Sequence, residues 1–267
     1  PTLAAPALLV NTAETETGSR LTCRFDAITP RAAPAAVVDW MKKKAVPLQS
    51  VTAGNGFADM EPLERLICNA RMVALGESTH GTREMFQMKH RFFEFLVEKM
   101  GFTVFGFESE WADSLALNQY VLTGEGDAKI AVSHLSEVWN TEEVLDLVKW
   151  MRGYNADPAH TKKVKIYGID VGGSRISADA VLAYLEKVDR GYGKTISAKI
   201  GLLKEYGVYG KFFRLPKADR DALVNSVNQL IAHFKRNKTN YQSKSSPGEY
   251  RLNLQHAVTL HQFLDYI

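Results

Sequence analysis

The sequence predicts an α/β fold in which helices cover a parallel sheet in a three-layer α/β/α arrangement, with an added all-helical subdomain. Short apolar runs of strand length recur at residues 71–77, 102–108 and 164–170. Segments with the apolar spacing of amphipathic helices separate them. From about residue 176 onward such runs stop and only helical patterns remain. Short buried strands alternating with helices are typical of parallel sheets.

The composition is that of an ordinary globular protein, with 45% hydrophobic and 24% charged residues. A net charge of only +3, spread along the chain, does not favour a nucleic-acid partner. No run reaches the ~18 apolar residues of a membrane helix. The predicted partner is therefore a small-molecule substrate, with no nucleic acid, no membrane and an open oligomeric state. A cytoplasmic location is expected, although the apolar start "PTLAAPALLV" leaves export open.

The chain is expected to begin with an extended lead-in over residues 1–37, rich in Thr, Ala and Pro. This lead-in runs into a helix around 33–48 that Pro47 stops. A second helix is predicted over 60–70, where Pro62 suits the first turn. The two cysteines, Cys23 and Cys68, allow one disulfide bridge but do not require it.

Residues 38–175 are predicted to form the first part of the α/β catalytic core. A helix from about Thr82 to Met100, closed by Gly101, follows the first apolar run. The second run is followed by a helix at 111–122 and the turn "TGEGD". Before the third run, the segment 141–155 reads as a helix with Thr141 as its N-cap.

Residues 176–267 are predicted to form the helical subdomain that covers the substrate cleft. In its last helix, one face is expected to carry Leu252, His256, Leu260, Phe263 and Ile267. No capping signal follows that helix, and three strands are few for an α/β domain. We therefore expect the chain to be a fragment of the full fold.

Each apolar run is predicted to end on a carboxylate, at Glu77, Glu108 or Asp170. Because ligands bind at the carboxyl ends of parallel strands, these acids and His80 should form one polar cluster in a cleft. The alternative is that each acid simply caps the helix that follows it.

Several other chemistries are not supported. Ser78 occupies the position of a G-x-S-x-G nucleophile, but His80 stands where the second Gly belongs. The chain has no phosphate-binding loop, dinucleotide fingerprint or zinc motif, so no cofactor is predicted. The remaining histidines are expected to be packed or solvated: His90, His134, His160, His233, His256 and His261.

The segment "LGESTHGTREMFQMKHRFFEFLVEKMGFTVFGFE", together with "TEEVLDLVKWMRGYN" and "KIYGID", resembles the erythromycin esterase family. The likeness is strong over about 38–175 and weaker in the helical part. It implies a carboxylic ester hydrolase that opens the lactone of a macrolide antibiotic, and hence a role in resistance, without an essential metal.

The resemblance also implies roles for individual residues. His80 would be the general base that activates water, and Glu77 and Glu108 would support it. Lys89 stands where characterised members carry Arg, which keeps the charge but loses the bidentate geometry. Lys89, Asp170 and Ser78 are the candidate oxyanion, substrate or supporting residues.

The family also has a second histidine motif, of the A-H-N-x-H type, that this sequence lacks. If the chain were complete it should be inactive. Two further readings stay open. One is a metal-dependent hydrolase that uses Glu77, His80, Glu108 and Asp170 as ligands. The other is a non-catalytic homologue that binds a small molecule.

Overall fold

The computed structural model describes residues 33–266. The chain divides into two compact units, 1–49 and 50–267. The described part of the first unit contains α1 (Ala35–Lys44), which ends before Pro47 as predicted. Most of the predicted lead-in, including Cys23, lies outside the described residues, and residues 35–37 already belong to α1.

The second unit opens with three helices: η1 (Ala58–Met60), α2 (Glu61–Ile67) and α3 (Arg83–Met100). Pro62 lies in the first turn of α2, where its missing N–H costs nothing. Gly101 closes α3 in a left-handed conformation with φ of 73°, which glycine adopts without steric cost. Both sequence predictions are confirmed.

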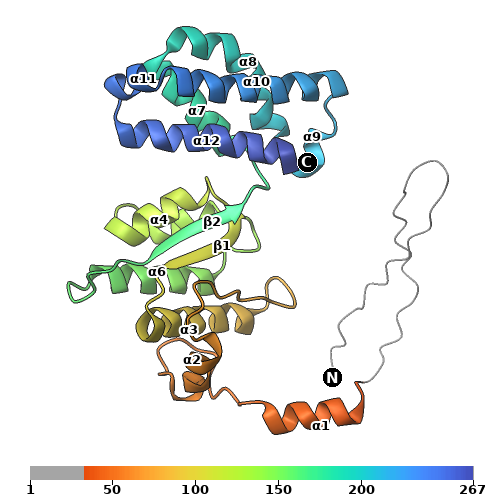
Figure 1. Ribbon diagram of the computed structural model, residues 1–267, viewed down its shortest axis with the longest axis vertical. Helices are drawn as coiled ribbons and strands as arrows, with labels where there is room; N and C mark the ends of the chain where they lie inside the picture. The colour runs from red at the N-terminus through yellow and green to blue at the C-terminus, as the bar shows by residue number, and fades with distance from the viewer. Residues whose placement is uncertain (1–32, 267) are drawn as a thin grey trace, which may run out of the picture. The chain divides into compact units, whose positions relative to one another are not determined.

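The sheet has two parallel strands, β1 (Val104–Glu110) and β2 (Lys165–Asp170), which confirms the predicted parallel pairing. Figure 1 shows the two strands side by side. Their register runs from Val104 opposite Lys165 to Phe107 opposite Gly168, and then jumps so that Glu110 faces Asp170. One extra residue in β1 thus forms a β-bulge.

The strand predicted at 71–77 is wrong, because this segment is irregular. Within residues 33–266 the sheet therefore has two strands rather than three. Met72 is 84% exposed and Ala74 is also exposed, while Val73 and Leu75 are only half-buried. An apolar run forms a strand only where neighbours bury its side chains and pair its backbone, and this run gains little of either.

One face of the sheet is buried and the other is largely open among the described residues. Phe105, Phe107 and Ile166 point into the core, whereas Val104 and Ile169 are 51% and 71% exposed. A three-layer arrangement would bury both faces of the sheet. Because one face is largely open among the described residues, the three-layer arrangement stays a prediction.

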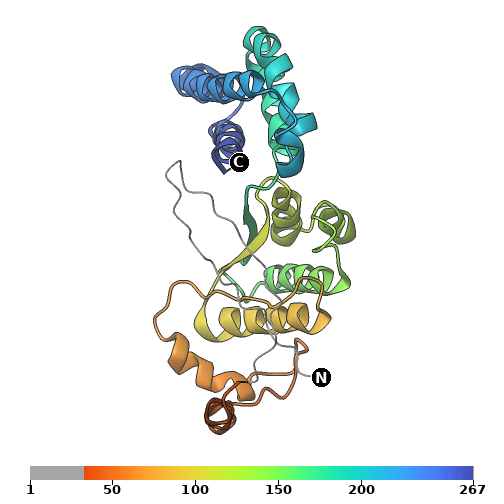
Figure 2. The ribbon, with the colours of Figure 1, turned by 90° about the vertical axis from the view of Figure 1, so that its right-hand side faces the viewer.

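The buried face packs against α3, α4 (Ser114–Thr123), α5 (Ala128–Ser133) and α6 (Glu142–Ala156), as Figure 1 and the turned view in Figure 2 show. Thr141 caps α6 as predicted, because its Oγ1 accepts a hydrogen bond of 3.3 Å from the N–H of Val144. This cap defines the residue at which α6 begins.

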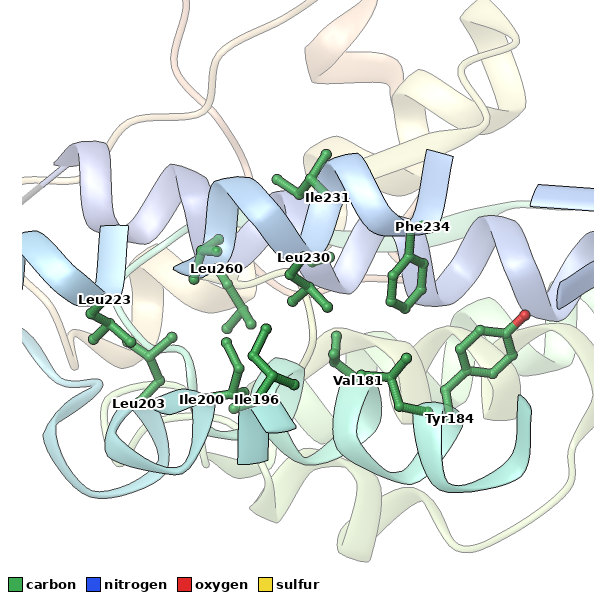
Figure 3. Packing of buried hydrophobic residues seen from close by; sticks show 14 of the residues in the cluster. Val181, Tyr184, Ile196, Ile200, Leu203, Leu223, Leu230, Ile231, Phe234 and Leu260 are labelled. Carbon is green, nitrogen blue, oxygen red and sulfur yellow. The ribbon is translucent and has the colours of Figure 1, made fainter. Parts of the chain in front are cut away.

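From residue 175 to residue 266, all regular secondary structure is helical. The bounds are α7 (Arg175–Val188), α8 (Arg190–Tyr206), α9 (Tyr209–Phe212), α10 (Lys217–Arg236), α11 (Lys238–Lys244) and α12 (Pro247–Tyr266). Figure 3 shows Leu230 and Phe234 of α10 packed toward Val181 and Tyr184 of α7. These helices form their own apolar core.

On α12, His256, Leu260 and Phe263 are buried, as the sequence predicts. Leu252 shares that helical face by its spacing on α12 but is 42% exposed, and Ile267 lies outside the described residues. Between residues 33 and 266, each helix is too short or too polar to cross a membrane.

His256 is a buried histidine that lacks an acidic partner in its described contacts. Its Nδ1 lies 3.1 Å from the hydroxyl of Ser177, and its ring packs edge-on against Trp111 at 4.9 Å. Burial lowers the pKa of His256 from 6.5 to about 4. Its imidazole is therefore neutral in the folded protein at pH 5 to 7.

This burial predicts an acid-sensitive stability. Between pH 6.5 and about 4 the unfolded chain binds a proton at His256 that the folded chain does not. The free energy of unfolding should therefore fall as the pH drops, by about 3 kcal/mol at most. Asp113, whose pKa is raised to about 6, acts in the opposite direction.

The measurement is urea unfolding of the wild type and His256→Phe at several pH values. The difference between the two proteins isolates the histidine, and it should shift in favour of the variant as the pH falls. His261→Phe, at a site 37% exposed, is the control and should follow the wild type. A pH-independent difference for His256→Phe would contradict the assignment.

Candidate functional site

The turn from Glu77 to Thr82 joins the irregular segment 71–77 to α3. Gly81 has a φ of 78°, a left-handed conformation that allows the chain to turn sharply into the helix. The hydroxyls of Thr79 and Thr82 share a hydrogen bond across the turn. His80 thus sits on a short loop that the left-handed Gly81 and the hydroxyl pair of Thr79 and Thr82 shape.

Glu77 is bonded to two side chains rather than to the backbone of α3. Its Oε1 accepts a hydrogen bond from Nδ1 of His80, and its Oε2 accepts one from Nζ of Lys89. The side chains of Glu77 and Lys89 are 10% and 17% exposed, whereas that of His80 is 55% exposed. These bonds argue against the reading of Glu77 as a simple helix cap.

The carboxylate of Glu77 defines the tautomer of the neutral His80 ring. Burial tends to raise the pKa of Glu77, but the hydrogen bonds and charges of Lys89 and His80 outweigh it, so the pKa is lowered. Glu77 is therefore ionised at neutral pH and can only accept. Nδ1 of His80 must then carry the proton, which leaves the lone pair on Nε2.

Glu108 lies beside this pair. One ligand-type atom each from Glu77, His80 and Glu108 falls within 4.8 Å of the other two. Glu108 is exposed and belongs to β1, which continues to Glu110. The prediction that this strand ends on Glu108 is therefore wrong by two residues, because the bulge extends the pairing.

The predicted site residues fall into two groups. Glu77, His80, Lys89 and Glu108 come together, and Ser78 is exposed in the same turn. Asp170 ends β2 as predicted, but it faces Glu110 in the register. Its carboxylate accepts a hydrogen bond of 2.7 Å from the N–H of Val171.

Asp113 and Glu110 form a further acidic pair that the sequence did not single out. Burial, and then the charge of Glu110, raise the pKa of Asp113 to about 6, and Arg175 and His134 oppose this shift. Since Glu110 ends β1, the pair lies where the chain leaves the sheet.

Trp139 forms the apolar side of the cluster and was also missed. Its ring lies edge-on to His80 at 5.2 Å, and Nζ of Lys89 stands 5.7 Å from its centre. Trp139 is 5% exposed and packs against Phe86 and Phe107. It lies in the irregular segment between α5 and α6, where no periodicity could have predicted its neighbours.

Residues 97–267, more than half of the chain, match the family model described as erythromycin esterase. The chain belongs to the erythromycin esterase family. The match includes the helical part, where the sequence alone suggested only a weak likeness. The family resemblance predicted from the sequence is confirmed.

Individual proteins are similar to parts of this chain. The chain is 32% identical over 139 residues to "Erythromycin esterase type II" of Escherichia coli, an alignment that covers 51% of this chain and 32% of that protein. A Bacillus cereus protein of known crystal structure is 31% identical with a TM-score of 0.72, over 86% of this chain and 56% of that one.

A crystal structure of an erythromycin esterase mutant in its open conformation is 17% identical with a TM-score of 0.59, over 78% of this chain and 52% of that one. At this identity the likeness shows a shared α/β fold. The chain spans about a third of the length of the Escherichia coli relative and about half of these two structures.

Proposed function

We propose that this member of the erythromycin esterase family is a metal-independent hydrolase that opens the lactone ester of a macrolide with a water molecule activated by His80. The observation that carries the proposal is the Glu77–His80 hydrogen bond, which leaves Nε2 as a base on a half-exposed ring. The name of the Escherichia coli relative, erythromycin esterase type II, supports the substrate class.

In the proposed reaction, Nε2 of His80 takes a proton from water while the water oxygen attacks the ester carbonyl. The carbonyl bond electrons move onto the oxygen, and the tetrahedral intermediate collapses as the ester C–O bond breaks. The imidazolium then returns the proton to the departing alkoxide. The products are a carboxylic acid, which loses its proton to solvent at neutral pH, and an alcohol within one opened ring.

The neighbours of His80 have matching roles in this proposal. Glu77 holds the Nδ1–H tautomer and stabilises the imidazolium that forms. Glu108 adds a second negative charge near that ring. Lys89 keeps Glu77 ionised and brings positive charge to the place where an oxyanion would develop. Ser78 and Asp170 are proposed only as supporting residues.

Mass spectrometry of erythromycin incubated with the full-length protein tests the proposal. The expected product has gained one water, and His80→Ala should lower its rate of formation about 10²- to 10⁴-fold. His261→Ala is the matched control at a half-buried histidine on α12 and should retain activity. Unchanged turnover by His80→Ala would remove His80 from the mechanism.

A second candidate is a metal-dependent hydrolase, which the spacing of Glu77, His80 and Glu108 favours. One imidazole and two carboxylates are a ligand set that divalent ions accept. The ammonium group of Lys89, bonded to Glu77, opposes a cation at the same place. Loss of activity after EDTA treatment, restored by a divalent ion, would favour the metal; full activity in EDTA would exclude it.

A further inference from the structure

Two contacts hold the ring of His80: a hydrogen bond to Glu77 and an aromatic contact with Trp139. Its Nδ1 bonds to Glu77, but a single hydrogen bond leaves the ring free to rotate about the donor–acceptor line. Since more than half of the side chain is exposed, little else restrains it. The second restraint is Trp139, whose plane makes an angle of 76° with the imidazole.

Trp139 itself is firmly placed. Its backbone N–H donates to the carbonyl of Ser136, and its carbonyl accepts from the N–H of Thr141, both at 2.9 Å. Thr141 in turn caps α6. The indole ring is enclosed by Phe86 of α3 and Phe107 of β1, so it cannot move without disturbing the core.

The start of α6 is also tied to the start of α3. Nε of Arg83 lies 3.1 Å from Oε1 of Glu143, in the first turn of α6. The 77–82 turn directly precedes Arg83. The turn that carries His80 is therefore joined to the start of α6 through Trp139 and through this ion pair.

Trp139 also faces the cation of the cluster. Nζ of Lys89 lies 5.7 Å from the centre of the indole ring, within the range of a cation–π interaction. The same ammonium donates to Glu77. One indole ring thus contacts both groups that hydrogen-bond to the Glu77 carboxylate.

We propose that Trp139 is the positioning residue of the site: its edge contact fixes the plane of the His80 ring, and its face holds Lys89 on Glu77. This inference rests on the proposed role of His80 as the base. A base held in one orientation accepts a proton without first being ordered, so loosening it lowers the rate rather than the affinity for substrate.

The test compares Trp139→Leu and Trp139→Phe with Trp150→Leu in the full-length protein. Leucine keeps an apolar side chain without a ring, and phenylalanine restores a ring. Trp150 is the matched control because it packs against His90, Phe93 and Tyr154 instead of His80. Thermal unfolding of each variant separates loss of fold from loss of position.

The kinetic readout is hydrolysis of erythromycin. We expect Trp139→Leu to lower kcat about 10- to 100-fold with little change in KM. Trp139→Phe should recover most of the loss, and Trp150→Leu should match the wild type. An unchanged kcat in folded Trp139→Leu would overturn the proposal.

A second readout needs no substrate. The imidazole C–H signals of His80 in NMR spectra, assigned with His80→Gln, should carry the ring-current shift of the indole. That shift should vanish in Trp139→Leu and persist in Trp150→Leu; His80 signals identical in all variants would overturn the contact. If the wild type hydrolyses no ester, the proposed function fails, while these signals still decide whether Trp139 orders His80.

Discussion

Replacing Glu77 by glutamine is expected to lower kcat for ester hydrolysis about 10²- to 10⁴-fold, although the side chain keeps its size. The Lys89 ammonium has only donors, so the amide oxygen of Gln must turn toward it. The amide NH₂ then faces His80 and donates to Nδ1. This moves the imidazole proton to Nε2, where the base is needed.

This explanation can be separated from simple loss of charge. In a Lys89→Met background nothing orients the amide, so Glu77→Gln should cost clearly less there than in the wild type. Such non-additivity is typical of residues that act as a unit. Glu84 is an exposed carboxylate in the first turn of α3, and Glu84→Gln is the control, which should leave kcat unchanged. Equal costs in both backgrounds would contradict the tautomer argument.

The helices were the most predictable part of the fold. α3 and α6 begin and end within one residue of the segments predicted at 82–100 and 141–155, because apolar spacing and capping signals are local properties. The segment 71–77 was misread because an apolar run pairs only if a neighbouring strand accepts it. The bulge in β1 likewise depends on its partner strand.

In the candidate site, too, local contacts could be predicted from the sequence and contacts between distant segments could not. Glu77 and His80 are three residues apart in one turn, so the sequence could predict their contact. Glu108 reaches them only because β1 passes beside the turn. The predicted grouping with Asp170 assumed that β1 ends on Glu108, whereas the bulge places Glu110 opposite Asp170. Trp139 comes from a segment without regular structure, so only the fold reveals it.

The guanidinium of Arg91 is the most deeply buried charge described in the α/β part, at 1% exposure. It donates to both carboxylate oxygens of Asp59, at 2.6 and 3.0 Å, and to the carbonyls of Gly56 and Ser50. These bonds fasten the 50–59 segment to α3, which also carries Lys89.

Arg91→Met should therefore lower the free energy of unfolding by about 3–5 kcal/mol, since it removes the guanidinium that bonds to both oxygens of the buried Asp59 carboxylate. Urea unfolding measures the loss. Lys217→Met breaks an ion pair with Asp221 whose side chains are 77% and 60% exposed, and it should cost no more than about 1 kcal/mol.

A double variant, Arg91→Met with Asp59→Leu, separates two contributions to the free energy of unfolding. One is the cost of the buried Asp59 charge when Arg91 is absent, and the other is the net stability that the ion pair contributes. If the charge of the buried Asp59 carboxylate in the absence of Arg91 causes the loss, removing that charge as well should restore part of the stability that Arg91→Met removes. If the double variant is as unstable as the sum of the single variants, the bonds to Gly56 and Ser50 matter more than the charge. Recovery would mean that the pair fixes the 50–59 segment against α3 more than it adds net stability.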